Sequence, residues 1–222
     1  MSLPLMIFAA GKGTRMAPLT DTVPKPLIPV AGRTLLDRAL DLGRAAGVGP
    51  VVVNIHHLGH QVRDHIGAQA AISDETDLLL DTGGGLRKAL PLLGAGPVIT
   101  MNPDVIWTGP NPIRALLAGW REDMDALLML VPIARTHGRQ GGGDFSLGPD
   151  NHLIRKGDLV YGGAQIIRPD RLEEIPETVF SLNLLWDRLI AEGRAFGLVH
   201  AGAWCDVGRP DCIPLAEELL GG

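Results

Sequence analysis

The feature that most constrains this chain is an apolar run that leads directly into a glycine-containing loop near the N-terminus. Residues 5–8, LMIF, have the composition and length of a short buried strand. In the loop that follows, AAGKGTRMAPLTDTVPKP, Gly11 and Gly13 permit positive φ and close approach of the backbone to a ligand. Inward-facing N–H groups form an anion site, and Arg15 and Lys25 add fixed positive charge. The stretch therefore predicts a polyphosphate-binding loop after a strand.

This loop departs from two common nucleotide-binding motifs. The dinucleotide-binding fingerprint requires a third glycine, and Met16 or Ala17 stands in its place. A P-loop requires Gly-Lys-Ser/Thr four residues after the first glycine, and that sequence is missing here. Lys25 lies between Pro24 and Pro26, which predicts an extended backbone and a side chain held in one direction.

Length and composition limit the classes of protein to consider. A chain of 222 residues with 45% hydrophobic content can bury one sizeable core, so we expect a single domain over residues 1–222. The net charge of −5 argues against nucleic acid or an anionic membrane as the main partner. No apolar run approaches the roughly 20 residues of a membrane span, and the N-terminus does not resemble a signal peptide. We therefore predict a cytoplasmic protein.

Strand and helix patterns alternate through the first half of the chain. A continuous β-branched run at residues 51–55 indicates a buried strand, and residues 97–101 form another. Helical spacing of apolar residues predicts helices over residues 33–46 and 58–66, the first beginning near Thr34. This order predicts parallel βαβ units and a three-layer α/β/α fold with a mixed, mainly parallel sheet. In such sheets ligands bind beyond the carboxyl ends of the strands, where the glycine loop falls.

In the second half of the chain, the predicted strands are expected to pair in a more antiparallel way than those of the first half. Residues 135–143, RTHGRQGGG, combine glycine with positive charge. This composition is typical of a loop that closes on a ligand and equally of a simple flexible turn. The other predicted elements are a helix at 111–120, strands at 125–133, 145–147, 153–156 and 159–168, a helix at 181–193, a strand pair at 196–200 and 203–206, and a closing helix at 210–220.

One carboxylate follows a predicted central strand directly. Asp104 comes after Asn102 and Pro103, at the carboxyl end of the strand at residues 97–101. A hard divalent cation that bridges phosphate oxygens needs oxygen ligands at such a crevice. Asp104 is therefore the first candidate for a metal ligand, with a turn-capping aspartate as the alternative.

The loop as a whole resembles the signature of the sugar-1-phosphate nucleotidyltransferases, AAGxGTRxxPLT followed by PKPLxPV, and matches it at almost every position through Val30. The family's Trp-x-Asp-x-Gly landmark is intact at residues 204–208. The resemblance implies a Rossmann-like, GT-A-like fold, with Asp104 and Asp206 converging on one Mg²⁺. The family usually has glycine where Pro103 stands, so this turn is expected to differ.

The resemblance also implies roles for residues along the whole chain. Arg15 holds the β and γ phosphates, and Lys25 stabilises the α-phosphate and the incoming sugar phosphate. In the DTGGG run, glycine leaves space for the base, and in the YGGA run it leaves space for the pyranose. The implied nucleotide-binding residues are Ala10, Gly11, Gly13, Thr14, Thr82, Gly83 and Gly84, and the implied sugar-phosphate-binding residues are Tyr161, Gly162 and Gly163.

By resemblance, the enzyme transfers a nucleoside monophosphate from a nucleoside triphosphate to a sugar 1-phosphate and releases pyrophosphate. Residues up to about 110 form the nucleotide half, and residues 111–222 the sugar-phosphate half. The short single-domain members are the most similar, which favours UTP with N-acetylmuramate 1-phosphate, the pair used in cell-wall recycling, over GTP with mannose 1-phosphate. The oligomeric state is left open between a monomer and a homodimer.

A protein of another class, a nucleotide-binding sensor that has lost turnover, is the alternative to an enzyme. Pro103 in place of the family's glycine is the feature that favours it. The retained Arg15, Lys25, Asp104 and Asp206 favour an enzyme.

Overall fold

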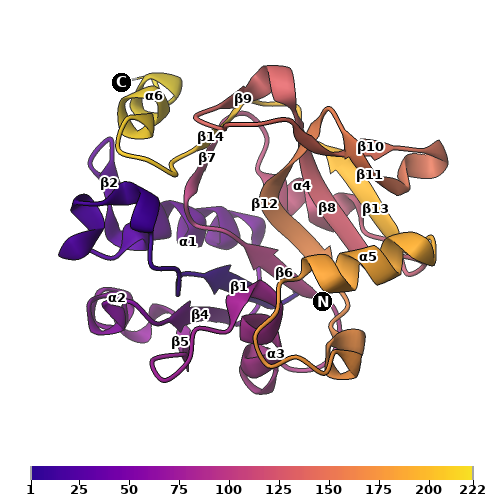
Figure 1. Cartoon of the computed structure of the whole chain (residues 1–222), viewed down its shortest axis with the longest axis horizontal. Coiled ribbons are helices and arrows are strands. Elements are labelled where there is room, and N and C mark those ends of the chain that lie inside the picture. The colour runs from indigo at the N-terminus through magenta and orange to yellow at the C-terminus, as the bar shows by residue number, and fades with distance from the viewer. Residues whose placement is uncertain (1, 222) are drawn as a thin grey trace.

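Parallel strands of the N-terminal half form one side of a nine-stranded sheet, and mostly antiparallel strands of the C-terminal half extend it (Figure 1). The computed structural model describes residues 2–221. The α/β fold with a mixed sheet that the sequence predicts is confirmed. Its main path is β11-β10-β12-β6-β1-β4-β5, with β8 paired to β12 and β13 paired to β8. The strands are β1 (Leu5–Phe8), β4 (Val51–Ile55), β5 (Ala71–Asp74), β6 (Val98–Met101), β8 (Ala126–Pro132), β10 (Gly143–Leu147), β11 (Leu153–Gly157), β12 (Leu159–Ile167) and β13 (Ala195–Val199).

Helices cover both faces of this sheet because successive side chains of a strand point to opposite faces. Leu5 and Ile7 of β1 pack in one core with α1, α2 and α4. Met6 packs in a second core with α3 and α5 on the other face. The three-layer arrangement follows from this alternation. The helices are α1 (Leu35–Ala46), α2 (Gly59–Ile66), α3 (Asp81–Leu93), α4 (Pro112–Gly119), α5 (Asn183–Ala191) and α6 (Cys212–Leu219).

Helix α1 shows why its predicted bounds are correct. The hydroxyl of Thr34 accepts a hydrogen bond from the Asp37 amide at 3.0 Å, which satisfies one of the free N–H groups of the first turn. At the other end, Gly47 adopts the left-handed conformation (φ 70°) and ends the helix. None of the helices in residues 2–221 is long and apolar enough to cross a membrane.

A second, three-stranded sheet, β7-β14-β9, was not predicted. It is built from β7 (Val105–Trp107), β9 (Thr136–His137) and β14 (Trp204–Asp206). The predicted pairing of the last two strands was wrong, because β13 pairs with β8 while β14 pairs with β7 and β9. His200 explains the change of direction. Its ring packs edge-on against Trp107, and its Nε2 lies 2.8 Å from the Thr108 carbonyl, so the chain turns away from the main sheet.

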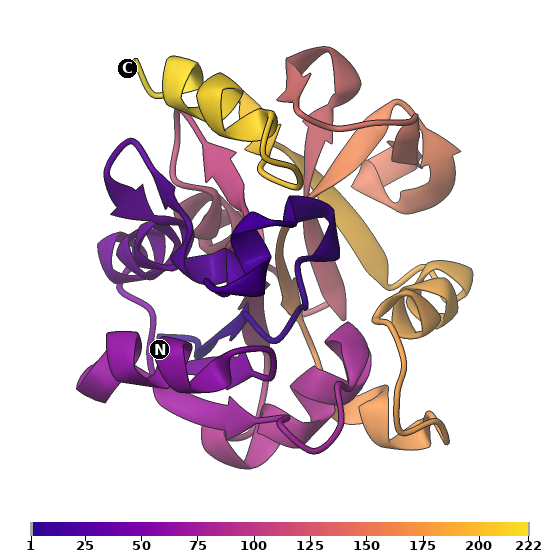
Figure 2. The same ribbon diagram turned by 60° about the vertical axis from the view of Figure 1, so that its left-hand side comes forward.

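The last helix of the chain lies against a segment of its N-terminal part. Figure 2 shows α6 beside the N-terminal segment that contains the glycine loop and the small hairpin of β2 (Pro29–Val30) and β3 (Arg33–Thr34). The Ala31 amide donates a hydrogen bond to Glu217 Oε1 at 2.9 Å. Residues of the loop, of β14 and of α6 also share a small buried core, so the N-terminal loop is supported by the last elements of the chain.

Candidate active site

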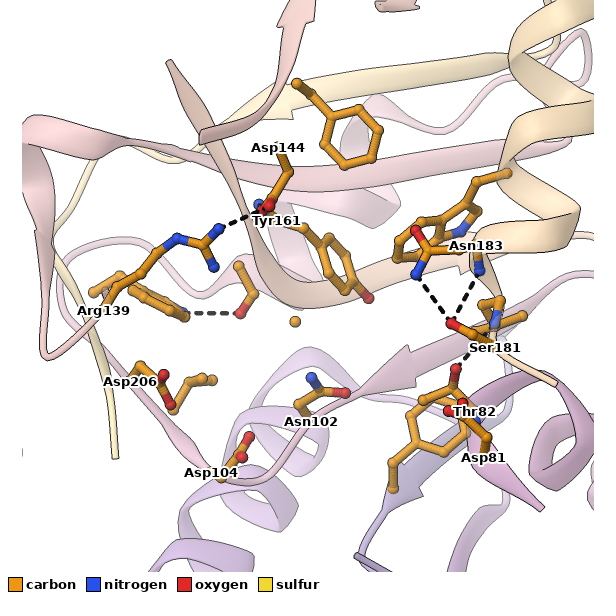
Figure 3. Close-up of a pocket in the computed structure, with 18 of the residues that line it drawn as sticks. Asp81, Thr82, Asn102, Asp104, Arg139, Asp144, Tyr161, Ser181, Asn183 and Asp206 are labelled. Atoms are coloured by element: carbon orange, nitrogen blue, oxygen red, sulfur yellow. Dashed lines mark hydrogen bonds and ion pairs between the residues drawn. The ribbon is translucent and has the colours of Figure 1, made fainter. Parts of the chain in front are cut away.

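A cleft beyond the carboxyl ends of β1 and β6 consists of three adjoining cavities, and Phe8 and Asp104 line all three. The glycine-loop cavity, about 230 Å³, is lined by Gly11, Gly13, Arg15 and Lys25 among others. The Glu75 cavity, about 460 Å³, lies against Asn54, Glu75 and Thr82. The Trp186 cavity, about 350 Å³, extends toward β10, β12 and α5. Figure 3 shows the Trp186 cavity, with Asp104 and Asp206 at one end and Ser181 and Asn183 at the other.

The two glycines of the N-terminal loop have different reasons to be glycine. Gly13 has φ 62°, and a Cβ there would lie 2.9 Å from Thr20 Cγ2 and 3.0 Å from Lys25 Cβ. It therefore allows the loop to fold on itself. A Cβ at Gly11 would meet nothing within 4 Å, so this backbone borders open space. Ala10 and Thr14 also line the cleft.

Lys25 makes a short ion pair inside the cleft. Its Nζ lies 2.5 Å from Asp104 Oδ2, and the residue is only 9% exposed. The predicted extended backbone at this position was wrong. Pro24 is extended, but Lys25 begins a 3₁₀ turn because the Leu27 amide donates to the Pro24 carbonyl at 2.8 Å. This turn and the ion pair fix the direction of the ammonium group.

Asp104 and Asp206 are brought together by the second sheet. Val105 of β7 is paired with Asp206 of β14, and the Val207 amide donates to the Asp104 carbonyl at 3.0 Å. Burial and the neighbouring Asp104 charge raise the pKa of Asp206, while Lys25, Arg15 and Arg139 lower it. The two carboxylates therefore share one electrostatic environment. Pro103, although it replaces the usual glycine, does not prevent this approach.

The donor set suits a hard divalent cation that is shared with a ligand. Carboxylate oxygens are the ligands that Mg²⁺ prefers. A cation beside Asp104 and Asp206 would also offset the repulsion between the two carboxylates. Within residues 2–221, no group of three or more His, Cys, Asp or Glu side chains could enclose a metal ion. Two carboxylates fit a Mg²⁺ ion that takes its remaining ligands from phosphate oxygens and water.

The DTGGG run begins α3, and its glycines are needed for another reason than the one predicted. Gly83 and Gly84 lie within the first turn of α3, and both amides donate to the Phe180 carbonyl. A Cβ at Gly83 would lie 2.3 Å from the Phe180 ring, and one at Gly84 would lie 2.5 Å from the Thr178 carbonyl oxygen. The predicted reason for these glycines, room for a base, was therefore wrong, because the chain's own segment fills that space. Thr82 does line the cleft.

A buried polar network beneath the Glu75 cavity was missed by sequence reasoning. Glu75 is 0% exposed, and its carboxylate accepts hydrogen bonds from Asn54 Nδ2 at 2.7 Å and from the Leu80 amide at 3.0 Å. Asn54 Oδ1 accepts one from the Ala9 amide at 2.7 Å. The polar Asn54 inside the apolar run VVVNI was the available signal. The network fixes the start of the glycine loop against β4 and α3.

The YGGA run lies where β12 changes register, and it lines the Trp186 cavity as a local bulge. Gly163 has φ 89°, which explains the need for glycine there. A Cβ at Gly162 would lie 2.4 Å from the Trp107 ring, so this glycine accommodates the protein's own indole rather than a ligand. The ring of Tyr161 packs edge-on against Trp186, with 4.8 Å between centroids. Burial raises the pKa of the Tyr161 hydroxyl.

Further charged residues of the Trp186 cavity were not identified from the sequence. Arg139 donates to Asp144 Oδ1 at 2.7 Å, and Asp144 Oδ2 accepts from the Tyr161 amide at 2.9 Å (Figure 3). Arg155 reaches the same cavity from β11. The GGGDF sequence around Asp144 was a visible signal, whereas nothing in the sequence around Arg155 indicates that it reaches the cleft. Residues 136–137 of the predicted loop form β9, which holds the start of this segment against β14.

Comparisons with known proteins show the family to which the chain belongs. Residues 5–206 match the model of the MobA-like NTP transferase domain family. The chain is 41% identical to N-acetylmuramate alpha-1-phosphate uridylyltransferase of Caulobacter vibrioides, over 97% of this chain and 96% of that protein. It is 36% identical to the protein of the same name from Neisseria meningitidis, over 97% of each. The structure of UDP-glucose pyrophosphorylase complexed with UDP-glucose has a TM-score of 0.80 at 16% identity, covering 100% of this chain and 99% of that one.

The fold is that of a nucleotidyltransferase. The chain belongs to the MobA-like NTP transferase family and, within it, to the sugar-1-phosphate nucleotidyltransferases.

Proposed function

We propose that this enzyme transfers uridine monophosphate from UTP to N-acetylmuramate 1-phosphate, giving UDP-N-acetylmuramate and pyrophosphate. The observation that carries the proposal is the convergence of Lys25, Asp104 and Asp206 beside the glycine loop, at the junction of the three cavities. The similarity to two uridylyltransferases of this specificity, over nearly the whole chain, supports the choice of base and sugar.

The reaction is an in-line displacement at the α-phosphate. The sugar phosphate oxygen is already ionised at neutral pH and needs no general base, so the protein's task is to position two anions and offset their repulsion. Lys25 is placed to do this because its Nζ is held beside Asp104. Arg15 lines both the glycine-loop and Trp186 cavities and would bind the leaving β and γ phosphates.

Asp104 and Asp206 would hold a Mg²⁺ ion, which neutralises developing charge on the phosphate oxygens. The uracil would occupy the Glu75 cavity beside Thr82, and the sugar would occupy the Trp186 cavity beside Tyr161 and Gly163. On this assignment, residues up to about 110 bind the nucleotide and residues 111–222 bind most of the sugar phosphate. The proposal includes a role in peptidoglycan recycling and a cytoplasmic location.

The deciding experiment measures Mg²⁺-dependent pyrophosphate release for UTP, GTP, CTP, dTTP and ATP, each with N-acetylmuramate, mannose, glucose and N-acetylglucosamine 1-phosphate. The proposal predicts one dominant combination, UTP with N-acetylmuramate 1-phosphate. Preference for GTP with mannose 1-phosphate would replace it by the guanylyltransferase alternative. Nucleotide binding without any turnover would favour the sensor, and Pro103→Gly would then be the first substitution to test.

A further inference from the structure

The Trp186 cavity contains a cation at the end away from the two carboxylates. Arg155 lies on β11 opposite Phe145 of β10, and its Nη2 donates to the Asn183 carbonyl at 3.3 Å. Asn183 lies at the opposite end of the cavity from Asp104 and Asp206 (Figure 3). Arg155 lines this cavity and neither of the other two. Its charge is therefore placed against the part of a ligand farthest from the reacting phosphate.

The guanidinium of Arg155 contacts two aromatic rings and a carboxylate. Its carbon Cζ lies 4.9 Å from the ring centroid of Phe145 and 5.7 Å from that of Trp186. Its Nε donates to Asp187 Oδ1 at 2.8 Å. Within residues 2–221, no hydrogen-bond partner occupies Nη1, so the Nη1–Nη2 edge keeps free donors. A planar guanidinium that offers this edge matches the geometry of a carboxylate.

The other cations of the cavity are already engaged near the reacting end. Arg139 is bound to Asp144 and to the Gly142 carbonyl, and its charge lowers the pKa of Asp206. Arg15 also lines the glycine-loop cavity. A sugar phosphate whose only anionic group is the phosphate would be bound by Arg139 and Arg15 alone. Arg155 is also paired, through Nε with Asp187, but it lies at the other end of the cavity and is the cation placed for a second anion on the sugar.

N-acetylmuramate differs from N-acetylglucosamine by a lactyl ether at O3, which ends in a carboxylate. Carbon 3 is separated from the anomeric carbon by carbon 2, and the lactyl arm extends beyond O3, so the carboxylate and the 1-phosphate are two separate anionic groups that can be bound at different places in a cavity. We propose that Arg155 binds the lactyl carboxylate and selects N-acetylmuramate 1-phosphate over sugar phosphates without it. This inference rests on the proposed function, and it adds a specificity residue that the reaction itself does not require.

Arg155→Met is the direct test, because it removes the charge and keeps an unbranched side chain over the two aromatic rings. Values of kcat/KM with UTP are compared for N-acetylmuramate 1-phosphate and for its lactyl amide, which replaces the carboxylate by a neutral group. The wild type should prefer the acid by about 10²-fold, as expected for a charge-assisted bidentate contact. Arg155→Met should lose most of that preference and retain activity with the amide.

Arg188→Met is the matched control. Arg188 lies on α5 next to Asp187, pairs with Glu174 and does not line the cavity, so the preference for the acid should persist. Arg155→Lys keeps a cation without the planar edge, and an intermediate preference is expected. It also provides the test if the methionine variant does not fold.

The outcomes separate this inference from the proposed function. If Arg155 variants lower kcat/KM equally for acid and amide, Arg155 is structural and the inference is overturned. The same conclusion follows if the preference is unchanged. A wild type that uses another sugar 1-phosphate and neither muramate compound would instead overturn the proposed function.

Discussion

Lys25 Nζ and Asp104 Oδ2 are 2.5 Å apart, although 79 residues separate them in the sequence. The ion pair joins the loop after β1 to the turn after β6, two parallel neighbours in the sheet. Because the Lys25 side chain is 11% exposed and that of Asp104 is 28% exposed, water screens the pair only partly. The cation proposed to stabilise the α-phosphate is thus held in place by a carboxylate of the proposed metal site.

Lys25→Met should lower turnover by on the order of 10²-fold or more, because it removes the charge that stabilises the α-phosphate. Lys88→Met is the control, since Lys88 contacts the Asp74 carbonyl and does not line the three cavities. Pyrophosphate release gives the rates, and circular dichroism checks that each variant is folded. A Lys25→Met rate equal to the wild type would remove this residue from catalysis.

Mg²⁺ affinity should depend on the nucleotide. Two carboxylates leave most ligand positions to phosphate and water, so we expect binding of Mn²⁺, a probe for Mg²⁺, to tighten by about 10-fold or more when UTP is present. Electron paramagnetic resonance of free Mn²⁺ measures this affinity with and without UTP. Asp104→Asn and Asp206→Asn should weaken it, whereas Asp123→Asn on the exposed surface should not. Equal Mn²⁺ affinity with and without UTP would contradict a shared site.

Most of the main elements could be predicted from local patterns. α1 has both a capping threonine and a terminal glycine, and β4 is a continuous apolar run, so each is specified by nearby residues. β7, β9 and β14 are only two or three residues long and are defined by pairing with distant segments. The strand at 203–206 was predicted, but periodicity needs several residues to be visible, so β7, β9 and the pairing of the second sheet could not be read from the sequence.

The candidate site was predictable where a motif is contiguous. The glycine loop and Asp104 both line the cleft as expected. Arg155 and Glu75 were missed because their place depends on strand pairing and on burial rather than on neighbouring residues. Gly83 and Gly162 were recognised as glycines that need space, but the space belongs to Phe180 and Trp107, which no local pattern reveals.

Gly83→Ala should lower stability, although helix propensity alone predicts the opposite. In an ordinary helix the change stabilises by roughly 0.5–1 kcal/mol. Here the new methyl group would lie 2.3 Å from the Phe180 ring, and such overpacking costs about 1–3 kcal/mol. Urea unfolding measures the difference. Gly142→Ala, where nothing lies within 4 Å, is the control and should change the free energy of unfolding little. A stabilised Gly83→Ala variant would refute the packing explanation.

His200 should make the stability of the fold depend on pH. The residue is 2% exposed, and burial lowers the pKa of its imidazole below the ordinary 6.5. The unfolded chain then binds a proton more readily than the folded one. The stabilisation is complete above pH 6.5 and is lost as the pH falls toward the lowered folded-state pKa.

His200→Gln keeps an N–H donor for the Thr108 carbonyl but cannot be protonated. Urea unfolding at a series of pH values should therefore show a flatter slope for this variant below pH 6.5 than for the wild type or for His60→Gln, which changes an exposed histidine. Parallel curves for His200→Gln and the wild type would show that other groups determine the acid sensitivity.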